Sequence, residues 1–495
     1  MFKFITVFLF VGVTLPGRFE QNGTWSDEGV RPCAQAQQKT KPQQPNIIFI
    51  LADDLGYADI GCYGQQKTET PNIDKLAKEG LKFTQFYSGS TVCAPARTTL
   101  MTGLHTGHTP IRGNKTFLPE GQTPLEENVV TIANQLQQHG YRTGAFGKWS
   151  LGFITTSGDP AKKGFEEFYG YNCQSLAHDY YPDHLWHNHD RIDFTKNLTA
   201  NVVYSADTIH AKAMQFIQQQ NSSTPFFLYL PYTLPHGDVI LPHDSVYNYY
   251  VQKFNEAAVP YNPKKDKLSY EPHPHAAFAA MVSRLDKYVG EIVNTITQQG
   301  LADNTLILFC SDNGPHKENG GDPDFFQNHG IYRGIKRDLY EGGIRVPFIA
   351  YWKGTIQPGV TDQWLALWDM YPTFEQVAGL PVTKKLDGIS IVPTLLNKGK
   401  QQQHKNLYWE FHENNGRQAV RWKNWKLVKL NVNLADSVVV ELYDLDKDPS
   451  EKNNIANQFP AKVKKLDAMI KKAHLPNEEW PLLPEEVKGK KIEND

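Results

Sequence analysis

Cysteine is scarce in this chain. Only five of the 495 residues are cysteines, and they lie far apart in the sequence. Small domains held together by disulfides have a much higher density of cysteine, so a disulfide scaffold is excluded. The count is also odd, and in an exported protein an odd count indicates one thiol with a different fate. The five are Cys33, Cys62, Cys93, Cys173 and Cys310.

The chain has no excess of charge of one sign. It contains 51 basic and 53 acidic residues, and its formal net charge is −2. Nucleic-acid-binding proteins usually have a strongly basic balance, so we expect no nucleic-acid partner. The length exceeds that of one ordinary domain, and we expect one large domain and one small one. The sequence leaves the oligomeric state open.

The N-terminal hydrophobic run is too short to cross a membrane. It covers residues 4–13, whereas a spanning helix needs about 20 apolar residues. A short apolar run behind Lys3 is typical of a secretory signal peptide, here residues 1–20, and a buried strand is the alternative. We expect a periplasmic or secreted protein with no transmembrane anchor. Residues 21–44 have the composition of a linker.

Apolar runs alternate with helical patterns over residues 45–395. The runs NIIFILA, PFFLYLPY and NTLILFC predict strands that are buried on both faces, and LKFTQFYS predicts one further strand. Residues 275–300 have the apolar spacing of a long helix. This alternation predicts the α/β class, with a mostly parallel central sheet covered by helices on both faces.

The pattern changes at about residue 396. NLYWEFHE, RQAVRWKNWKLVKL and ELYDLDKD predict short strands with hairpin spacing, and FPAKVKKLDAMIKKAH predicts a final helix. We therefore expect a small C-terminal α+β subdomain with an antiparallel sheet at residues 396–480. A tail follows at residues 481–495.

A candidate anion site lies in the stretch CAPARTTLMTG, which begins at Cys93. Pro95 suits the first turn of a helix, which places Cys93 at the helix N-terminus. Unpaired N–H groups and the helix dipole favour an anion there, and Arg97 adds a fixed charge one turn later. An ordinary buried cysteine before a helix is the alternative.

Oxygen ligands close two of the predicted strands. Asp53 and Asp54 end the first strand, and Asp312 and Asn313 end a later one. Four oxygen donors at the carboxyl ends of strands suit a hard cation such as Ca²⁺ or Mg²⁺. Asp and Asn also close strands as ordinary turn formers, so each pair alone is weak evidence.

These motifs together resemble the sulfatase family, within the alkaline-phosphatase-like superfamily. The family signature C-x-P-x-R matches at Cys93, Pro95 and Arg97, and the resemblance extends from about Asn46 into the C-terminal subdomain. It implies an alkaline-phosphatase-like fold and an arylsulfatase-like sulfuric ester hydrolase. Further stretches match in the family's order, namely ILADDLG, GKW, LPYTLPH, SDNG, GIKRDLYEGGIRVP and ELYDLDKDPSEKNNIA.

The resemblance implies a modified nucleophile and one Ca²⁺ ion. A maturation enzyme would oxidise Cys93 to formylglycine, whose hydrate attacks the sulfur of a sulfate ester. This gives the odd cysteine its separate fate. The implied Ca²⁺ ligands are Asp53, Asp54, Asp312, Asn313 and the modified Cys93.

The resemblance also assigns roles to several basic residues. Arg97 would stabilise the hydrate and the metal site. Lys148, in GKW, and Lys336, in GIKRD, would hold sulfate oxygens, because the negative charge there must be balanced. His236, in LPYTLPH, would protonate the leaving oxygen alone or together with Lys336. Without the surrounding family pattern, solvated surface charges are the preferred interpretation of Lys148 and Lys336, and an ordinary loop histidine is the preferred interpretation of His236.

The sequence departs from the family at Ser150. Most relatives carry GKWHLG, and that histidine takes the proton when sulfate leaves, a role that a neutral serine fills poorly. Either the chain is a weakly active binder, or Ser150 positions a relay water, or another histidine replaces the missing one. His178 is the favoured replacement, in the stretch 173–190, which is otherwise typical of a polar surface loop.

A sulfated carbohydrate, with galactose-type units, is the expected substrate. Tyr180, Tyr181 and Trp186 are candidates for stacking on sugar rings, and Trp409 and His412 could reach in from the C-terminal subdomain. Aromatic residues are as often part of a core. The alternative functions are a phosphatase or phosphonate hydrolase of the same superfamily and a non-catalytic glycan binder.

Overall fold

The computed structural model describes residues 44–118, 120–261 and 270–486. The predicted signal peptide, Cys33, the linker up to residue 43 and residues 487–495 of the predicted tail lie outside this part of the chain. Among the helices that are described, none is long and apolar enough to cross a membrane.

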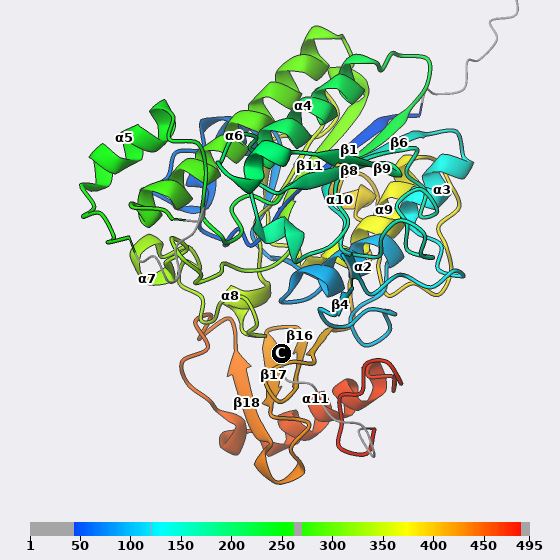
Figure 1. The fold of residues 1–495 in the computed structure, drawn as a ribbon. Coiled ribbons are helices and arrows are strands. Elements are labelled where there is room, and N and C mark those ends of the chain that lie inside the picture. The colour runs from blue at the N-terminus through cyan, green and yellow to red at the C-terminus, as the bar shows by residue number, and fades with distance from the viewer. Residues whose placement is uncertain (1–43, 119, 262–269, 487–495) are drawn as a thin grey trace, which may run out of the picture. The chain divides into compact units, whose positions relative to one another are not determined.

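A ten-stranded sheet runs through the centre of the structure (Figure 1). In spatial order its strands are β13 (Gly359–Thr361), β2 (Leu81–Phe83), β12 (Phe348–Tyr351), β11 (Thr305–Ser311), β1 (Asn46–Ala52), β10 (Phe226–Pro231), β6 (Arg142–Lys148), β7 (Glu167–Tyr171), β8 (His184–His187) and β9 (Asp190–Asp193). The five from β11 to β7 are mutually parallel. Antiparallel pairs flank them on both sides, and β13 pairs parallel with β2 at one edge.

Helices cover both faces of this sheet. One face packs against α1 (Pro71–Glu79), α4 (Ser205–Gln218), α5 (Ser245–Phe254) and α6 (Pro274–Gln298), and the other against α2 (Cys93–Thr102), α3 (Ile132–Gln138), α9 (Met370–Val377) and α10 (Val392–Leu395). The two short helices α7 (Pro323–Phe326) and α8 (Glu341–Ile344) lie in loops. The predicted α/β/α sandwich is confirmed.

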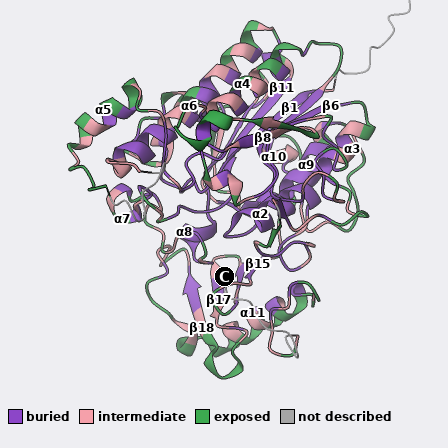
Figure 2. Ribbon diagram, viewed as in Figure 1, coloured by how far each residue is buried: buried purple, intermediate pink, exposed green. Residues whose placement is uncertain are grey.

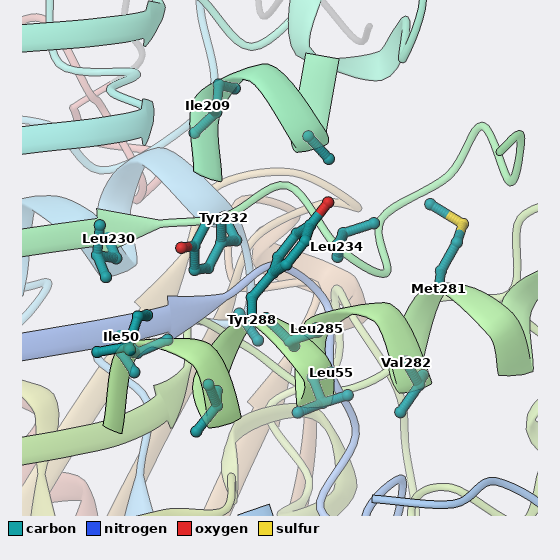
Figure 3. Packing of buried hydrophobic residues seen from close by; sticks show 14 of the residues in the cluster. Ile50, Leu55, Ile209, Leu230, Tyr232, Leu234, Met281, Val282, Leu285 and Tyr288 are labelled. Atoms are coloured by element: carbon teal, nitrogen blue, oxygen red, sulfur yellow. The ribbon is translucent and has the colours of Figure 1, made fainter. Parts of the chain in front are cut away.

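Strand β1 shows why its sequence is apolar at every position. Ile48 and Ile50 belong to the hydrophobic cluster with α4 and α6, whereas Ile47 and Phe49 belong to the cluster with α2 and α9. Figure 3 shows Ile50 in the first cluster, beside Tyr288 of α6. Side chains alternate across a strand, so a strand with two covered faces needs apolar residues throughout. Figure 2 shows the central strands buried.

The prediction of one strand in LKFTQFYS was wrong. The stretch forms β2 in the main sheet and β3 (Phe86–Tyr87), which pairs with β14 (Leu365–Ala366) in a separate two-stranded sheet. Between them, the carbonyl of Thr84 accepts hydrogen bonds from the Arg345 guanidinium and from the hydroxyl of Tyr57. These side chains occupy a backbone group that would otherwise continue the strand ladder. A second small sheet joins β4 (Thr116–Phe117) to β5 (Gly121–Gln122).

The C-terminal region forms the predicted antiparallel sheet. Its strands are β15 (Leu407–Phe411), β16 (Arg417–Trp422), β17 (Trp425–Leu430) and β18 (Val439–Asp444), in that order. One face packs on Tyr87, Ile344 and Trp368 of the preceding region, and the other is covered by α11 (Pro460–Ala473). The exact domain boundaries stay predictions.

Candidate active site

The carboxyl ends of neighbouring parallel strands bring the predicted polar residues together. Asp53 and Asp54 are the first two residues after β1, and Asp312 directly follows the adjacent β11. The backbone N–H of Asp54 donates to Oδ1 of Asp312 at 3.1 Å. Lys148 is the last residue of β6, and His236 lies in the loop after β10. Ligand sites of open α/β sheets lie at this edge.

Cys93 is the first residue of α2, as predicted, and it is fully buried. Its Sγ lies 3.4 Å from Oδ1 of Asp53 and 3.4 Å from Nζ of Lys148. Burial and the carboxylate of Asp53 raise the pKa of the Cys93 thiol well above its usual range, against the effect of Lys148. The unmodified side chain is therefore a neutral thiol, which is a poor nucleophile.

Arg97 joins the two strand ends. Its guanidinium pairs with Oδ2 of Asp53 at 3.0 Å and with Oδ2 of Asp312 at 2.8 Å, and it also donates to the carbonyl of Lys148. All of these side chains are buried. Buried charges are retained only when they are paired and hydrogen-bonded, so Arg97 fixes the geometry of this edge.

Two lysines contact the aspartates that follow β1. Nζ of Lys148 lies 2.7 Å from Oδ2 of Asp53, and Nζ of Lys336 lies 2.7 Å from Oδ2 of Asp54. Burial raises the pKa values of both carboxyl groups, but the neighbouring cations outweigh it and hold them well below their usual range. Both carboxylates are therefore charged at neutral pH, and both lysines lie at the point where an anion would bind.

The tautomer of His236 follows from its contacts. Nδ1 contacts the carbonyl of Gly237, which can only accept, so Nδ1 carries the proton. Nε2 then accepts from Nζ of Lys336 at 3.1 Å. Burial and Lys336 hold the pKa of His236 well below its usual range. His236 is therefore a neutral imidazole whose unprotonated nitrogen is hydrogen-bonded to the ammonium group of Lys336.

The residues at this edge also fit a hard cation. Asp53, Asp54, Cys93 and His236 place their ligand atoms within 4.8 Å of one another. Oδ1 of Asn313 is buried without a hydrogen-bond partner among the described residues, while its Nδ2 donates to Oδ1 of Asp54 at 2.6 Å. A buried amide oxygen left free beside carboxylates is a suitable ligand for Ca²⁺.

His178 lies next to this cluster. It ends a short 3-10 helix, η2 (Leu176–His178), and its ring centroid is 4.3 Å from that of His236 in a perpendicular arrangement. Burial, Lys148 and Lys336 lower the pKa of His178 to about 4. The imidazole is therefore neutral at pH 7 and can accept a proton.

The other histidines of this stretch have structural partners. His184 pairs with Glu120 at 2.6 Å, and His189 pairs with Asp159 at 2.8 Å. His187 lies on β8, which forms a hairpin with β9, so the stretch is only partly a loop. His187 is opposite Tyr169 of β7, and His184 is opposite Asp193 of β9.

Ser150 is buried and has an unusual backbone. Its φ is 62°, in the left-handed region that non-glycine residues seldom occupy. Its Oγ has no hydrogen-bond partner among the described residues. The backbone N–H of Ser150 donates to the carbonyl of Asn172 at 3.2 Å, and both polar side-chain atoms of Asn172 are also buried and unpartnered. Buried polar atoms of this kind call for a water or a ligand.

Comparison with known proteins identifies the family. The model of the sulfatase family matches residues 45–380, more than half of the chain. The chain belongs to the sulfatase family. The C-terminal model of N-sulphoglucosamine sulphohydrolase also matches, over residues 327–476. Members of the family hydrolyse sulfuric esters, and this chain is such a hydrolase.

Individual relatives agree with this assignment. Human arylsulfatase A is 32% identical over 458 residues, which cover 83% of each chain. N-acetylgalactosamine-6-O-sulfatase of Bacteroides thetaiotaomicron is 29% identical over 88% of this chain and 95% of its own. The crystal structure of Ps i-CgsB in complex with k-i-k-neocarrahexaose superposes with a TM-score of 0.74 and 28% identity, covering 90% of this chain and 96% of that one.

Several predicted sugar-contacting residues of this sulfatase lie elsewhere. Trp409 is fully buried between Tyr87 and Trp368, and its indole N–H donates to the carbonyl of Ser88 at 2.9 Å. No face of its ring is free for a sugar. His412 pairs with the buried Glu410 at 3.0 Å, in a separate cluster.

The aromatic residues of the His178 stretch have structural contacts. Tyr180 is fully buried, and its hydroxyl donates to the carbonyls of Thr233 and His236, so it holds the histidine loop. Tyr181 is also buried, and the indole of Trp186 donates to Glu120. The burial of Tyr180 and Tyr181 leaves them no surface for stacking on a sugar, whereas Trp186 is half-buried.

Three residues near the site were not identified from the sequence. His316 is buried beside His236, and its Nε2 donates to the carbonyl of Pro235 at 3.0 Å. Glu318 lies with His178 and His236 in a second group of potential metal ligands. His316 lies three residues after Asn313, and this proximity in the sequence could have identified it as a candidate site residue. The third, Asn172, has no motif around it that marks it.

Proposed function

We propose that this sulfatase removes O-sulfate from carbohydrates, on galactose-type units, with a formylglycine made from Cys93 and one Ca²⁺ ion. The observation that carries the proposal is the surroundings of Cys93. A neutral, buried thiol lies 3.4 Å from both a carboxylate and an ammonium group, beside further carboxylates at the strand ends. A metal site with a cation-lined anion pocket suits sulfate transfer better than it suits a structural cysteine.

The oxygen donors at the strand ends would hold the cation. Asp53, Asp54, Asp312 and Asn313 provide carboxylate oxygens and the free Oδ1 of the amide. Bound Ca²⁺ supplies a positive charge that activates an oxygen nucleophile and polarises a sulfate oxygen. The formylglycine hydrate supplies that nucleophile and, through its second hydroxyl, the route by which sulfate is released.

The basic residues around Cys93 would bind and orient the sulfate group. Lys148 and Lys336 pair with aspartates in this structure, and their ammonium groups lie beside the nucleophile position. Arg97 holds the two strand ends in register. Charges that are fixed before the reaction stabilise the transition state without reorganisation. Lys336 also donates to His236, and this pair delivers the proton to the leaving oxygen.

The missing histidine at position 150 requires another base for sulfate release. We assign this role to His178, because its imidazole is neutral at pH 7 and its ring lies 4.3 Å from that of His236. A serine hydroxyl has no basic form in this pH range. The competing route is a water held by Ser150 Oγ and the Asn172 amide, whose polar atoms have no partners among the described residues.

The names of two relatives support the choice of substrate. One is an N-acetylgalactosamine-6-O-sulfatase, and the structure of Ps i-CgsB contains k-i-k-neocarrahexaose. A formylglycine-generating enzyme is the partner that the modification of Cys93 requires. Export by the N-terminal segment, to the periplasm or the medium, completes the proposal.

Two measurements test this function. The protein is purified from its own host, and the mass of a peptide that contains residues 93–97 is measured. The mass should show that an aldehyde has replaced the thiol of Cys93. Turnover is then compared on galactose and N-acetylgalactosamine 6-sulfates, matched phosphate esters and a phosphonate ester. Desulfation of the sugars supports the proposal. An unmodified Cys93 with preferred phosphate or phosphonate turnover would instead favour the phosphatase alternative, and binding without turnover would favour a glycan binder.

A further inference from the structure

A group of lysines surrounds two tryptophans on the C-terminal subdomain. Trp422 and Trp425 flank the turn between β16 and β17, next to α11. Around the ring of Trp422, the Nζ atoms lie 3.7 Å (Lys465), 4.9 Å (Lys462) and 5.4 Å (Lys423) from the centroid. Lys462 also lies 4.4 Å from the centroid of Trp425. Three ammonium groups thus lie around the indole ring of Trp422.

These lysines differ from Lys429 and Lys471 in having no acidic partner within 4.0 Å among the described residues. Lys429 and Lys471, from β17 and α11, both pair with Asp467 at 2.9 Å. Within the described ranges, no carboxylate oxygen comes within 4.0 Å of the ammonium group of Lys423, Lys462 or Lys465. The contacts of their ammonium groups that the structure shows are those with the indole rings.

Such a cluster is suited to a polyvalent anion. Like charges around one ring repel one another, and the attraction between a cation and an indole ring offsets that repulsion only in part. The tryptophans hold the lysine stems in place, which lowers the entropy lost when the ammonium groups bind a ligand. Several anionic groups at fixed spacing would relieve the repulsion at all three lysines together.

The cluster is separate from the active site. One face of the C-terminal sheet packs on the region that contains Cys93, and Trp422 and Trp425 belong to the opposite face, which α11 covers. Figure 1 shows α11 on the side of this sheet away from α2. A small substrate cannot contact both places. An extended chain with repeated anionic groups can occupy this cluster while another molecule or another part of the chain enters the active site.

We propose that Trp422, Lys423, Lys462 and Lys465 form an accessory binding surface for a sulfated polysaccharide. The choice of a sulfated glycan over other polyanions rests on the proposed carbohydrate substrate. An anionic membrane fits less well, because lysine ammonium groups lie over both tryptophan rings, which are the large aromatic groups that would otherwise insert. The surface would retain the enzyme on its polymer between turnovers.

The test compares two charge-matched double variants of the full chain. Lys462→Gln/Lys465→Gln removes two cluster lysines, and Lys471→Gln/Lys472→Gln removes two exposed lysines further along the same helix. Binding to chondroitin 6-sulfate is measured at several salt concentrations. The cluster variant should bind about 5- to 10-fold more weakly and show a shallower salt dependence, whereas the control should change less than about 2-fold. The pair Lys462→Arg/Lys465→Arg should restore binding.

Other readouts separate the possible failures. Turnover of a sulfated monosaccharide should be unchanged in every variant, because the cluster does not contact the site. Equal losses in both double variants, or none in either, would overturn the accessory surface even if turnover is normal. Selective loss of binding to phosphatidylglycerol vesicles would overturn it in favour of a membrane. Absence of monosaccharide turnover with intact, cluster-dependent polymer binding would refute the proposed function and leave the surface standing.

Discussion

Two buried groups of charges can be compared within this chain. At the edge of the main sheet, Asp53, Arg97 and Lys148 are fully buried and paired. Beneath the C-terminal sheet, Lys426 lies 2.9 Å from Glu341 and 3.0 Å from Glu451, and these side chains are also buried.

The two groups differ in what surrounds the charges. Glu341 is enclosed by Lys426, by Arg345 at 3.2 Å and by the hydroxyl of Tyr87 at 2.7 Å, so its charge is neutralised from several sides. The active-site group is flanked by unpartnered polar atoms, Asn313 Oδ1 and Ser150 Oγ. Glu341 is closed in by its own partners and joins two regions, whereas the polar atoms beside the active-site group have neither a hydrogen bond nor an ion pair among the described residues and can contact a ligand.

The largest expected effect belongs to Cys93→Ala. Loss of the nucleophile should lower kcat by about 10⁴- to 10⁶-fold, with little change in melting temperature because the side chain is small. Steady-state turnover and thermal unfolding check this. Cys62→Ala, at a half-buried cysteine, is the matched control and should keep full turnover. Retained activity in Cys93→Ala would mean that Cys93 is structural.

Breaking the other group should affect stability instead. Lys426→Met leaves the carboxylates of Glu341 and Glu451 buried without their shared cation, which should cost about 3–5 kcal/mol of unfolding free energy. Denaturant unfolding measures the loss, and Lys447→Met, at an exposed lysine of the same region, should change it by less than about 0.5 kcal/mol. A loss of kcat per folded molecule would show that the two groups are not independent.

Two variants distinguish a histidine base from a relay water in the release of sulfate. His178→Ala should lower kcat about 10²-fold, and Ser150→Ala should remain near the wild-type rate. His187→Ala, in the same stretch but paired with Glu167 at 3.8 Å, is the control. The reverse ranking of the first two variants would transfer the role to a water bound by Ser150.

The smallest expected effect depends on pH. His474 lies between Glu410 at 2.8 Å and Glu486 at 2.7 Å; burial lowers its pKa, but these carboxylates outweigh burial and raise it. Its stabilisation is therefore full below the unfolded pKa and is lost as pH rises through the folded one. His474→Gln should lose about 0.5–1 kcal/mol near pH 6, allowing for solvent screening, and less at pH 9. A loss that is equal at both pH values, with His189→Gln as control, would contradict this.

The strands and the strand-end residues were predictable because their signals are local. A continuous apolar run followed by two aspartates predicts β1 and the polar residues at its end, and the same reasoning found β11 and Asp312. The order of neighbouring parallel strands then brings these residues together without further information.

The parts that sequence reasoning missed depend on distant partners. LKFTQFYS divides into two strands that pair with different partners, β12 and β14, and nothing in the octapeptide indicates either partner. Trp409 was a candidate sugar contact, but the C-terminal sheet packs its ring against Trp368, which only the docking of the two regions decides. Burial of an aromatic residue is set by such packing and not by its neighbours in sequence.

The complete burial of Cys93 bears on whether its thiol can be modified before or after the chain folds. Its Sγ is covered by Asp53 and Lys148, which come from separate strands of the main sheet. If an enzyme oxidises this thiol, as we propose, it must reach the thiol before α2 docks on the sheet. The modification would then come before folding is complete.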